Sequence, residues 1–239
     1  MCILLAARRP GPAPELWLAA NRDEHVDRPW APPGLLASDP AVFGGRDLLA
    51  GGSWLAVNLA AGFVVAVTNA RLGAPRGERS RGELVVDVAS QRTVAEAAAL
   101  VGELDLERWG PFNLFIADAW SFWVATNLPS PALECLPESC VTIGNDSLAS
   151  PGERVLAARG RACSLLSAPG DPEAGLRQLL ADHDGSDPLC RHAGKYGTVC
   201  ATVLHVAGRV VSRYLFAPGP PCVTPFAQVA VPPRGSLVA

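Results

Sequence analysis

Short apolar runs recur along the chain in pairs separated by turn residues, which is the pattern of β-hairpins. The four pairs are residues 2–7 with 15–21, 53–60 with 63–69, 113–118 with 122–127, and 198–206 with 210–216. Within them, residues 63–67 and 114–117 are apolar at consecutive positions instead of alternating with polar ones. Consecutive apolar positions predict strands that are covered on both faces. The pattern therefore predicts mainly antiparallel sheets buried on both sides.

Helix signals stand between these hairpins. Capping boxes begin at Ser80 and Thr93, and Ser150 precedes a proline at a first helical position. Asp171 begins a fourth predicted helix, which we expect to end at Ala181. Two hairpins, two helices, a hairpin, two helices and a hairpin thus follow one another along the chain.

This order of elements predicts the fold class. Sheets covered on both faces, with helices supplied in pairs, indicate an α+β protein in which two stacked sheets lie between two helical layers. The predicted architecture is a four-layer α/β/β/α sandwich formed by residues 1–239 as a single domain. Residues 129–139 and 218–239 are expected to be irregular.

Composition narrows the classes of function. The chain has 239 residues, of which 49% are hydrophobic and 18% charged, and its formal net charge is −3. Because nucleic-acid binders usually carry a basic surplus, no nucleic-acid partner is expected. Residues 48–70 contain no charge and are long enough to span a bilayer, but their glycines and asparagines favour a buried hairpin. The apolar start followed by Arg8 and Arg9 is the reverse of a signal peptide, which favours a cytosolic chain. A lipid attached at Cys2 would lack a second membrane signal, so no stable membrane anchor is expected.

The cysteines predict a reducing compartment. Seven cysteines are an odd number in a chain too long to need disulfide staples, which favours reduced thiols and a cytoplasmic location. Cys135 and Cys140 lack a second close pair and are a poor zinc site. Further residues that in principle offer haem or metal ligands are His183, Cys190, His192, Cys200 and Cys222. We interpret each of them as a loop or core residue and predict no metal site.

Hairpin geometry places the chain terminus beside a charged run. If the first hairpin turns near Gly11, Cys2 lies opposite Ala20, and residues 21–24 follow at the same end of the sheet. A second hairpin that turns near Gly62 brings residues 51–52 beside residues 69–71 by the same arithmetic. If both hairpins point the same way, a thiol, several charges and a side-chain amide share one sheet edge.

A terminal cysteine can supply a nucleophile and its own base. Removal of Met1 would leave the thiol and the α-amine on Cys2, and such an amine has a pKa of about 7.7–8.0. Arg22 would favour the thiolate, and Asp23 could orient the ammonium group. The alternative is that Cys2 is merely a small apolar residue in a terminal strand. Carboxamide donors suited to a tetrahedral oxyanion are Asn69 and Asn145.

Several motifs resemble a known family. They are Met1-Cys2, Asn21-Arg22-Asp23-Glu24, Gly44-Gly45-Arg46-Asp47, Gly51-Gly52-Ser53-Trp54, Thr68-Asn69-Ala70-Arg71 and Ser80-Arg81-Gly82-Glu83-Leu84-Val85. In order and spacing they resemble the NRDE family, the transport and Golgi organisation protein homologues, over about the first third of the chain. Weaker matches at residues 112–114, 144–145 and 190–192 extend the resemblance.

The resemblance implies a fold and a set of roles. It implies an N-terminal nucleophile hydrolase, distantly similar to choloylglycine hydrolases, penicillin V acylases and acyl-CoA-dependent penicillin acyltransferases. In those enzymes a terminal cysteine attacks an amide or thioester, while arginine, aspartate and asparagine residues assist. The implied catalytic residues are Cys2, Arg22, Asp23, Asn69 and Asn145. Expected substrate-binding residues are Asn21, Glu24, Trp54, Arg71, Arg81 and His192.

We therefore expect a hydrolase or acyltransferase that acts on a small amide or thioester through an acyl-enzyme on Cys2 and needs no cofactor. The alternative is a non-catalytic carrier of haem or acyl-CoA on the same fold, because eukaryotic relatives are linked to haem trafficking and lipid metabolism. One departure concerns Thr198-Val199-Cys200-Ala201, where relatives often carry Thr-Arg-Ser-Ser. A substrate contact from an arginine at that place is absent here.

Overall fold

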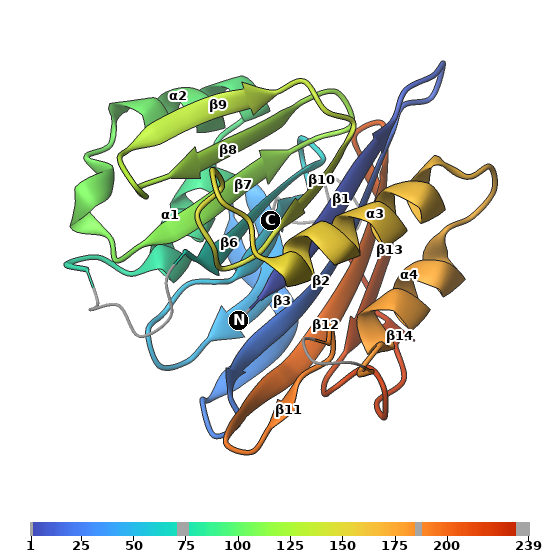
Figure 1. The fold of residues 1–239 in the computed structure, drawn as a ribbon. Coiled ribbons are helices and arrows are strands. Elements are labelled where there is room, and N and C mark those ends of the chain that lie inside the picture. The colour runs from blue at the N-terminus through green and yellow to red at the C-terminus, as the bar shows by residue number, and fades with distance from the viewer. Residues whose placement is uncertain (1, 71–76, 185–187, 233–239) are drawn as a thin grey trace.

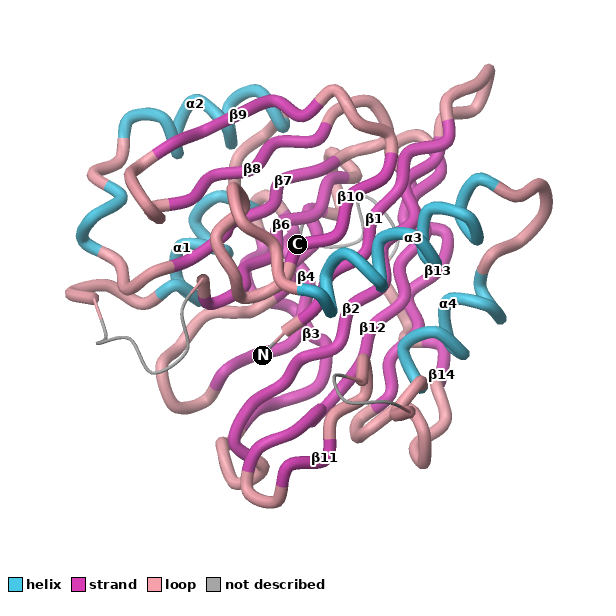
Figure 2. Tube along the Cα trace, viewed as in Figure 1, coloured by secondary structure: helices cyan, strands magenta, loops and turns pink. Residues whose placement is uncertain are grey.

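The computed structural model describes residues 2–70, 77–184 and 188–232. In this part of the chain two antiparallel sheets lie face to face, and a pair of helices covers the outer face of each sheet (Figure 1). Figure 2 shows the helices on the outside of both sheets. The predicted α/β/β/α sandwich is confirmed.

The first sheet contains the N-terminal hairpin. Its strands, in spatial order, are β10 (Cys140–Ile143), β1 (Ile3–Arg9), β2 (Glu15–His25), β12 (Tyr196–Ala207), β13 (Val210–Ala217) and β14 (Ala227–Gln228), with β11 (His192–Ala193) beside β12. The register differs from the prediction, because the residue opposite Ala20 is Leu4 and not Cys2. The hairpin turns about residue 12 instead of residue 11, which shifts the pairing by two positions. A shift of two preserves the face on which each side chain lies.

The second sheet is a meander of neighbouring strands. Its strands are β3 (Trp30–Ser38), β4 (Ala41–Asp47), β5 (Leu55–Asn58), β6 (Phe63–Asn69), β7 (Phe112–Ala117), β8 (Phe122–Thr126) and β9 (Ala132–Leu136). The uncharged stretch at residues 48–70 forms the β5–β6 hairpin, as predicted. The strands β3 and β4 were not predicted, because their proline and glycine residues obscure the strand pattern.

Two segments expected to be irregular contain strands. Residues 129–139 include β9, an edge strand that pairs with β8, so that prediction is wrong. The strand is half exposed and has a weak apolar signal; its pairing partner is what defines it. Within residues 218–239, the short strand β14 pairs with β13, and residues 233–239 lie outside the described part.

The helices begin close to their predicted positions. They are α1 (Arg81–Ala89), α2 (Val94–Glu103), α3 (Glu153–Ser167) and α4 (Glu173–Ala181). Ser80 and Thr93 cap α1 and α2 with their side chains. The expected cap at Ser150 is wrong, since α3 begins after Gly152, whose backbone N–H donates to the Asp146 carboxylate at 3.1 Å. None of the described helices is long and apolar enough to cross a membrane.

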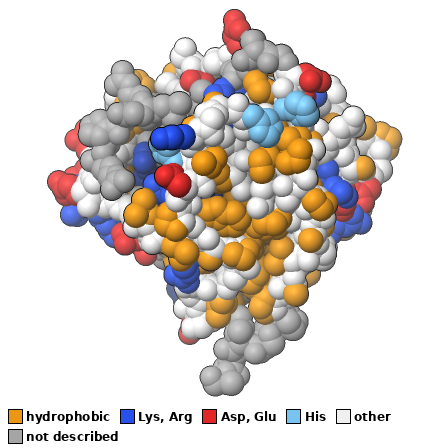
Figure 3. Space-filling model, turned by 90° about the horizontal axis from the view of Figure 1, so that it is seen from below, with side chains coloured by type: hydrophobic (Ala, Val, Ile, Leu, Met, Phe, Trp, Pro, Cys, Tyr) orange, Lys and Arg blue, Asp and Glu red, His pale blue; other side chains and the backbone are white. Residues whose placement is uncertain are grey.

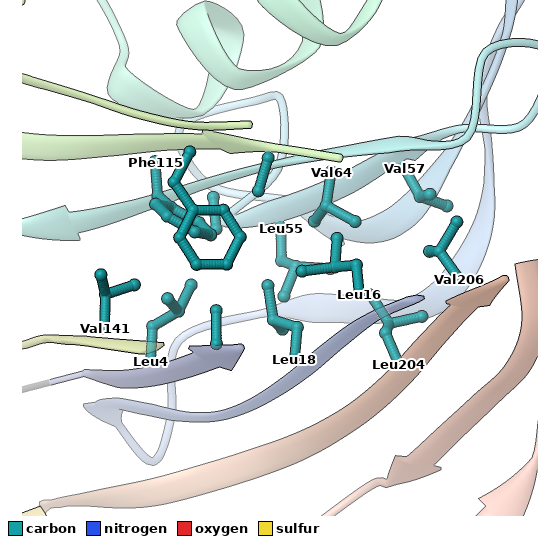
Figure 4. Close-up of a cluster of buried hydrophobic side chains, with 14 of the residues drawn as sticks. Leu4, Leu16, Leu18, Leu55, Val57, Val64, Phe115, Val141, Leu204 and Val206 are labelled. Carbon is teal, nitrogen blue, oxygen red and sulfur yellow. The ribbon is translucent and has the colours of Figure 1, made fainter. Parts of the chain in front are cut away.

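The core explains the consecutive apolar runs. Leu4, Leu18, Leu55 and Val64 pack between the two sheets (Figure 4). The neighbouring residue Val65 points the other way, into the layer between its sheet and α1 and α2. A third apolar layer joins the first sheet to α3 and α4. Alternate residues of one strand therefore enter two different apolar layers, and each fully buried aliphatic side chain contributes about 1.5–3 kcal/mol.

One disulfide bond contradicts the expectation that all thiols are reduced. Cys140 in β10 is bonded to Cys163 in α3 and thus links an edge strand to the helix that covers it. The other five cysteines are free thiols. The two bonded residues are 23 positions apart, and no spacing pattern in the sequence marks them as partners.

Candidate active site

A cleft of about 480 Å³ opens between the ends of the two sheets, which is a size typical of small-molecule sites. The first two hairpins bring residues from both sheets to it, and the start of α1 adds a third wall. Residues that line it include Cys2, Arg22, Asp23, Glu24, Asp47, Trp54, Asn69 and Arg81. The predicted convergence of the two hairpins at one edge is therefore confirmed.

Cys2 lines this cleft and is partly buried. Its Sγ is 3.9 Å from the backbone oxygen of Asp23, to which the thiol donates a hydrogen bond. Burial raises the pKa of the Cys2 thiol, while the positive charges of the terminal amine and Arg22 act in the opposite direction. The thiol is therefore protonated near neutral pH and needs a base before it can act as a nucleophile. A small space of about 20 Å³ extends from it between the sheets, enough for one water-sized group.

Arg22 offers an unused donor beside this thiol. Its guanidinium lies over the Trp54 ring, 4.4 Å from the ring centroid, and its Nη2 donates to Asp47 at 3.1 Å. Its Nη1 is buried and has no hydrogen-bond partner among the described residues. Leaving a charged donor buried and unpaired is unfavourable, and a ligand with an acceptor oxygen would relieve that cost.

Asp47 and Gly45, which were not among the predicted site residues, hold Arg22 and Trp54 in place. The Asp47 carboxylate also accepts from Arg28 Nε at 2.8 Å. Burial alone would raise the pKa of Asp47, but hydrogen bonds from Arg28 and from a backbone N–H, with the charges of Arg28 and Arg22, outweigh burial and hold that pKa below its ordinary value. A Cβ at Gly45 would lie 2.2 Å from the Trp54 ring, so only glycine lets the indole occupy this position. The glycine pair before Asp47 was the available signal.

Asp23 presents its backbone to the thiol and its carboxylate to the helical layer. Oδ2 accepts from Arg154 Nη2 at 3.1 Å, and Oδ1 accepts from the Thr198 hydroxyl at 2.7 Å. The Tyr196 hydroxyl donates to the Asp23 backbone oxygen at 2.8 Å. Burial raises the pKa of Asp23, although the Arg154 charge and the Thr198 hydrogen bond oppose that rise. These three partners, none of them identified from the sequence, fix the strand end against which Cys2 lies.

The two candidate oxyanion donors differ in position. Asn69 ends β6 and lines the cleft with Cys2. The Asn145 amide donates to the backbone oxygen of Asn69, and its own Oδ1 has no partner in the described chain. Asn145 therefore connects the end of β10 to the end of β6. Of the two asparagines, Asn69 is the one that lines the cleft.

The expected substrate-binding residues separate into groups. Glu24, Trp54 and Arg81 line the cleft. The Asn21 amide is used elsewhere, because it donates to the backbone oxygens of Leu180 and Leu189 at 2.9 and 2.7 Å on the helical side. His192 lies on β11 and does not line the cleft. Arg71 lies outside the described residues.

Comparisons with known proteins support the fold. The family model described as Transport and Golgi organisation 2 matches residues 1–214. The structure of an N-acylethanolamine-hydrolyzing acid amidase ortholog from Caenorhabditis elegans superposes with a TM-score of 0.62 at 15% identity, covering 85% of this chain and 92% of that one. Eukaryotic HslV from Trypanosoma brucei aligns with a TM-score of 0.42 at 12% identity, covering 86% and 99%. No curated protein matches the sequence. The likeness to the amidase shows that the two chains share one fold, in agreement with the predicted α/β/β/α sandwich.

Proposed function

The chain belongs to the Transport and Golgi organisation 2 family, and from this premise and the cleft we propose that it is an N-terminal cysteine hydrolase or acyltransferase. Its substrate would be a small amide or thioester, and its nucleophile Cys2 after removal of Met1. The observation that carries the proposal is the position of the Cys2 thiol in the same cleft as the unpartnered Nη1 of Arg22. The amidase fold adds support at the level of architecture alone.

The first half of the proposed reaction forms an acyl-enzyme. The α-amine of Cys2 takes the thiol proton, the sulfur attacks the carbonyl carbon, and a C–S bond forms while the carbonyl electron pair moves onto oxygen. In this proposal Arg22 Nη1 and the Asn69 amide stabilise that oxyanion, and the support is that both residues line the cleft with Cys2. When the carbonyl re-forms, the bond to the leaving amine or thiol breaks, and the leaving group takes the proton from the α-ammonium.

The second half releases the acyl group. Water or an acceptor amine attacks the thioester carbon and gives its proton to the α-amine. The C–S bond then breaks, and the sulfur takes the proton from the α-ammonium, which regenerates the Cys2 thiol. The raised pKa of the thiol fits this scheme, because a protonated thiol needs the adjacent base that the free α-amine supplies. The narrow space beside Sγ favours a small acyl group, and the arginines of the cleft favour a substrate with an acidic or strongly polar portion.

Intact-mass analysis tests this proposal directly. The purified chain is weighed to establish loss of Met1, then incubated with a panel of small thioesters and amides, quenched with acid and digested. We expect an acyl group on Cys2 and turnover of at least one thioester or amide of the panel. Cys2→Ala should abolish both, whereas Cys135→Ala, which removes an exposed thiol outside the cleft, should change neither. Retention of Met1, or full turnover by Cys2→Ala, would contradict the mechanism.

A further inference from the structure

A second group of reactive side chains lies apart from the cleft, near β11. The Sγ atoms of Cys190 and Cys222 are 3.5 Å apart, and the Nε2 atom of His192 is 3.1 Å from Cys222 and 3.7 Å from Cys190. Both cysteines are free thiols. None of the three residues lines the cleft that contains Cys2.

These distances match those between the ligands of a tetrahedral zinc ion. With Zn–S bonds of about 2.3 Å and Zn–N bonds of about 2.0 Å, tetrahedral angles place two sulfurs about 3.8 Å apart and a sulfur and a nitrogen about 3.5 Å apart. Each observed separation lies within about 0.4 Å of these values. We propose that Cys190, His192 and Cys222 form a binding site for Zn²⁺ or a cation of the same class.

The backbone around each ligand is already fixed. Cys190 lies in a bend two residues before His192, where its backbone N–H donates to the Asp182 oxygen at 2.8 Å, and His192 begins β11. The β11–β12 turn follows, where Gly194 has the positive φ of 65° that glycine readily adopts. Cys222 lies in a separate turn, held by N–H groups of Val223 and Thr224 that donate to the Pro220 oxygen. Two anchored segments thus converge, and a cation would join them without refolding either.

The three side chains range from buried to exposed, so a cation could reach the cluster from solvent. Cys190 is fully buried, Cys222 is half-buried and His192 is exposed. Figure 3 views the end of the molecule where β11 lies and shows histidine side chains beside hydrophobic ones at the surface. The His183 ring contacts the His192 ring edge-on, 6.0 Å between centroids, so a further imidazole lies beside the three ligands. Two thiolates and one imidazole leave a fourth position, and this donor set favours zinc over hard cations.

A cation at this site would stabilise the β11–β12 strand pair, which contacts Asp23 in the candidate active site. The backbone N–H of Arg191, between two of the ligands, donates to the Thr198 hydroxyl at 2.9 Å, and that hydroxyl donates to Asp23. A cation held by Cys190 and His192 would therefore stabilise the strand pair that positions Asp23. The role inferred is structural, and it stands independently of any reaction at Cys2.

Cobalt substitution tests the site. The full chain, reduced and freed of metal with a chelator, is titrated with Co²⁺, then with Zn²⁺. We expect one equivalent of Co²⁺ to produce the thiolate-to-cobalt charge-transfer band and the visible bands of tetrahedral cobalt, and Zn²⁺ to displace it. Zn²⁺ should also raise the melting temperature of the chain.

Variants assign the ligands. Cys222→Ser and His192→Ala should each weaken binding at least about 100-fold, because even groups that only orient a ligand contribute about 10–100-fold. His192 is exposed, so its variant should fold even where Cys222→Ser does not. Cys135→Ser, which removes an exposed thiol outside the cluster, should bind as the wild type does. Absence of the charge-transfer band, equal affinity in His192→Ala, or loss of binding in Cys135→Ser would overturn the proposal.

Discussion

At the scale of single residues, Arg22 is a charged side chain of the cleft whose hydrogen-bonding capacity is not filled by the described residues. One guanidinium nitrogen is paired with Asp47, and the ring of Trp54 covers the flat face. The remaining Nη1 is buried without a partner among the described residues, and Arg22 lines the cleft together with Cys2. Lysine at this position would keep the charge. It could not both donate to Asp47 and stack on Trp54, because it lacks the planar guanidinium group with its several N–H donors.

Alkylation of Cys2 measures this donor without any assumption about substrate. In the wild type, we expect Arg22 to increase the rate at which anionic iodoacetate alkylates Cys2, relative to the rate of neutral iodoacetamide. Arg22→Met should lower this ratio of iodoacetate rate to iodoacetamide rate about tenfold, which is equivalent to about 1.4 kcal/mol. Rates are read by mass spectrometry of the Cys2 peptide. Arg79→Met at the rim of the same cleft is the matched control and should change the ratio little. An unchanged ratio in Arg22→Met would show that Nη1 does not act on ligands at Cys2.

Asp23 and Arg154 form a buried pair that supports the strand end. Both side chains are almost fully buried. Asp23→Asn should lower the free energy of unfolding by about 3 kcal/mol, because it leaves the Arg154 charge without its counter-charge. Urea denaturation measures the loss. The double variant Asp23→Asn/Arg154→Met should recover part of it, and a double variant as unstable as the sum of the single ones would refute the coupling.

At the scale of elements, the helix starts show where local sequence decides and where it does not. Thr93 fulfils its predicted role, and its Oγ1 accepts from the Glu96 N–H at 3.1 Å. Ser150 is predicted to cap α3 in the same way, and its hydroxyl would then accept from the Gly152 N–H. In the structure that N–H donates to the Asp146 carboxylate instead. The difference arises because Asp146 reaches that N–H from the preceding loop, which itself is held by Asn113.

Alanine substitution separates these two serine or threonine positions. Thr93→Ala should destabilise the protein by about 1 kcal/mol through loss of the cap. Ser150→Ala, also at an exposed position, should change the stability by less than about 0.5 kcal/mol. Thermal and urea unfolding of the two variants give the comparison. Equal losses would mean that Ser150 stabilises the start of α3 in a way the structure does not contain.

At the scale of the whole molecule, Asp47 joins the two sheets at the cleft. It ends β4 of one sheet and holds Arg22 of the other, together with Arg28 from the loop after β2. Because the pKa of Asp47 is lowered by folding, its contribution to stability is complete above the ordinary pKa of 3.8 and is lost as the pH falls through the lower, folded value.

Acid unfolding of an Asp47 variant tests that sign. At neutral pH, Asp47→Asn should be less stable than the wild type by about 2–4 kcal/mol, since two arginines lose their shared acceptor. The difference should shrink as the pH falls below about 4. Leu49→Ala, an exposed side chain in the adjoining loop, should differ from the wild type by the same amount at every pH. A difference for Asp47→Asn that grows on acidification would contradict the assigned pKa direction.

The sequence by itself determined the four hairpins, the four helices and the layered fold, because hairpin pairing, capping and consecutive apolar runs depend on neighbours along the chain. It also brought Cys2 to Arg22, since both belong to one hairpin and an error of two residues leaves the faces unchanged. It did not determine β3, β4 or β9, whose apolar patterns are weak and which are defined by pairing within the second sheet. Only the tertiary structure decided contacts between distant segments: the Asp23–Arg154 pair, the Cys140–Cys163 bond and the cluster around Cys190. Residues of these sets are far apart in sequence, and their meeting depends on how the sheets and helices pack, which no local pattern encodes.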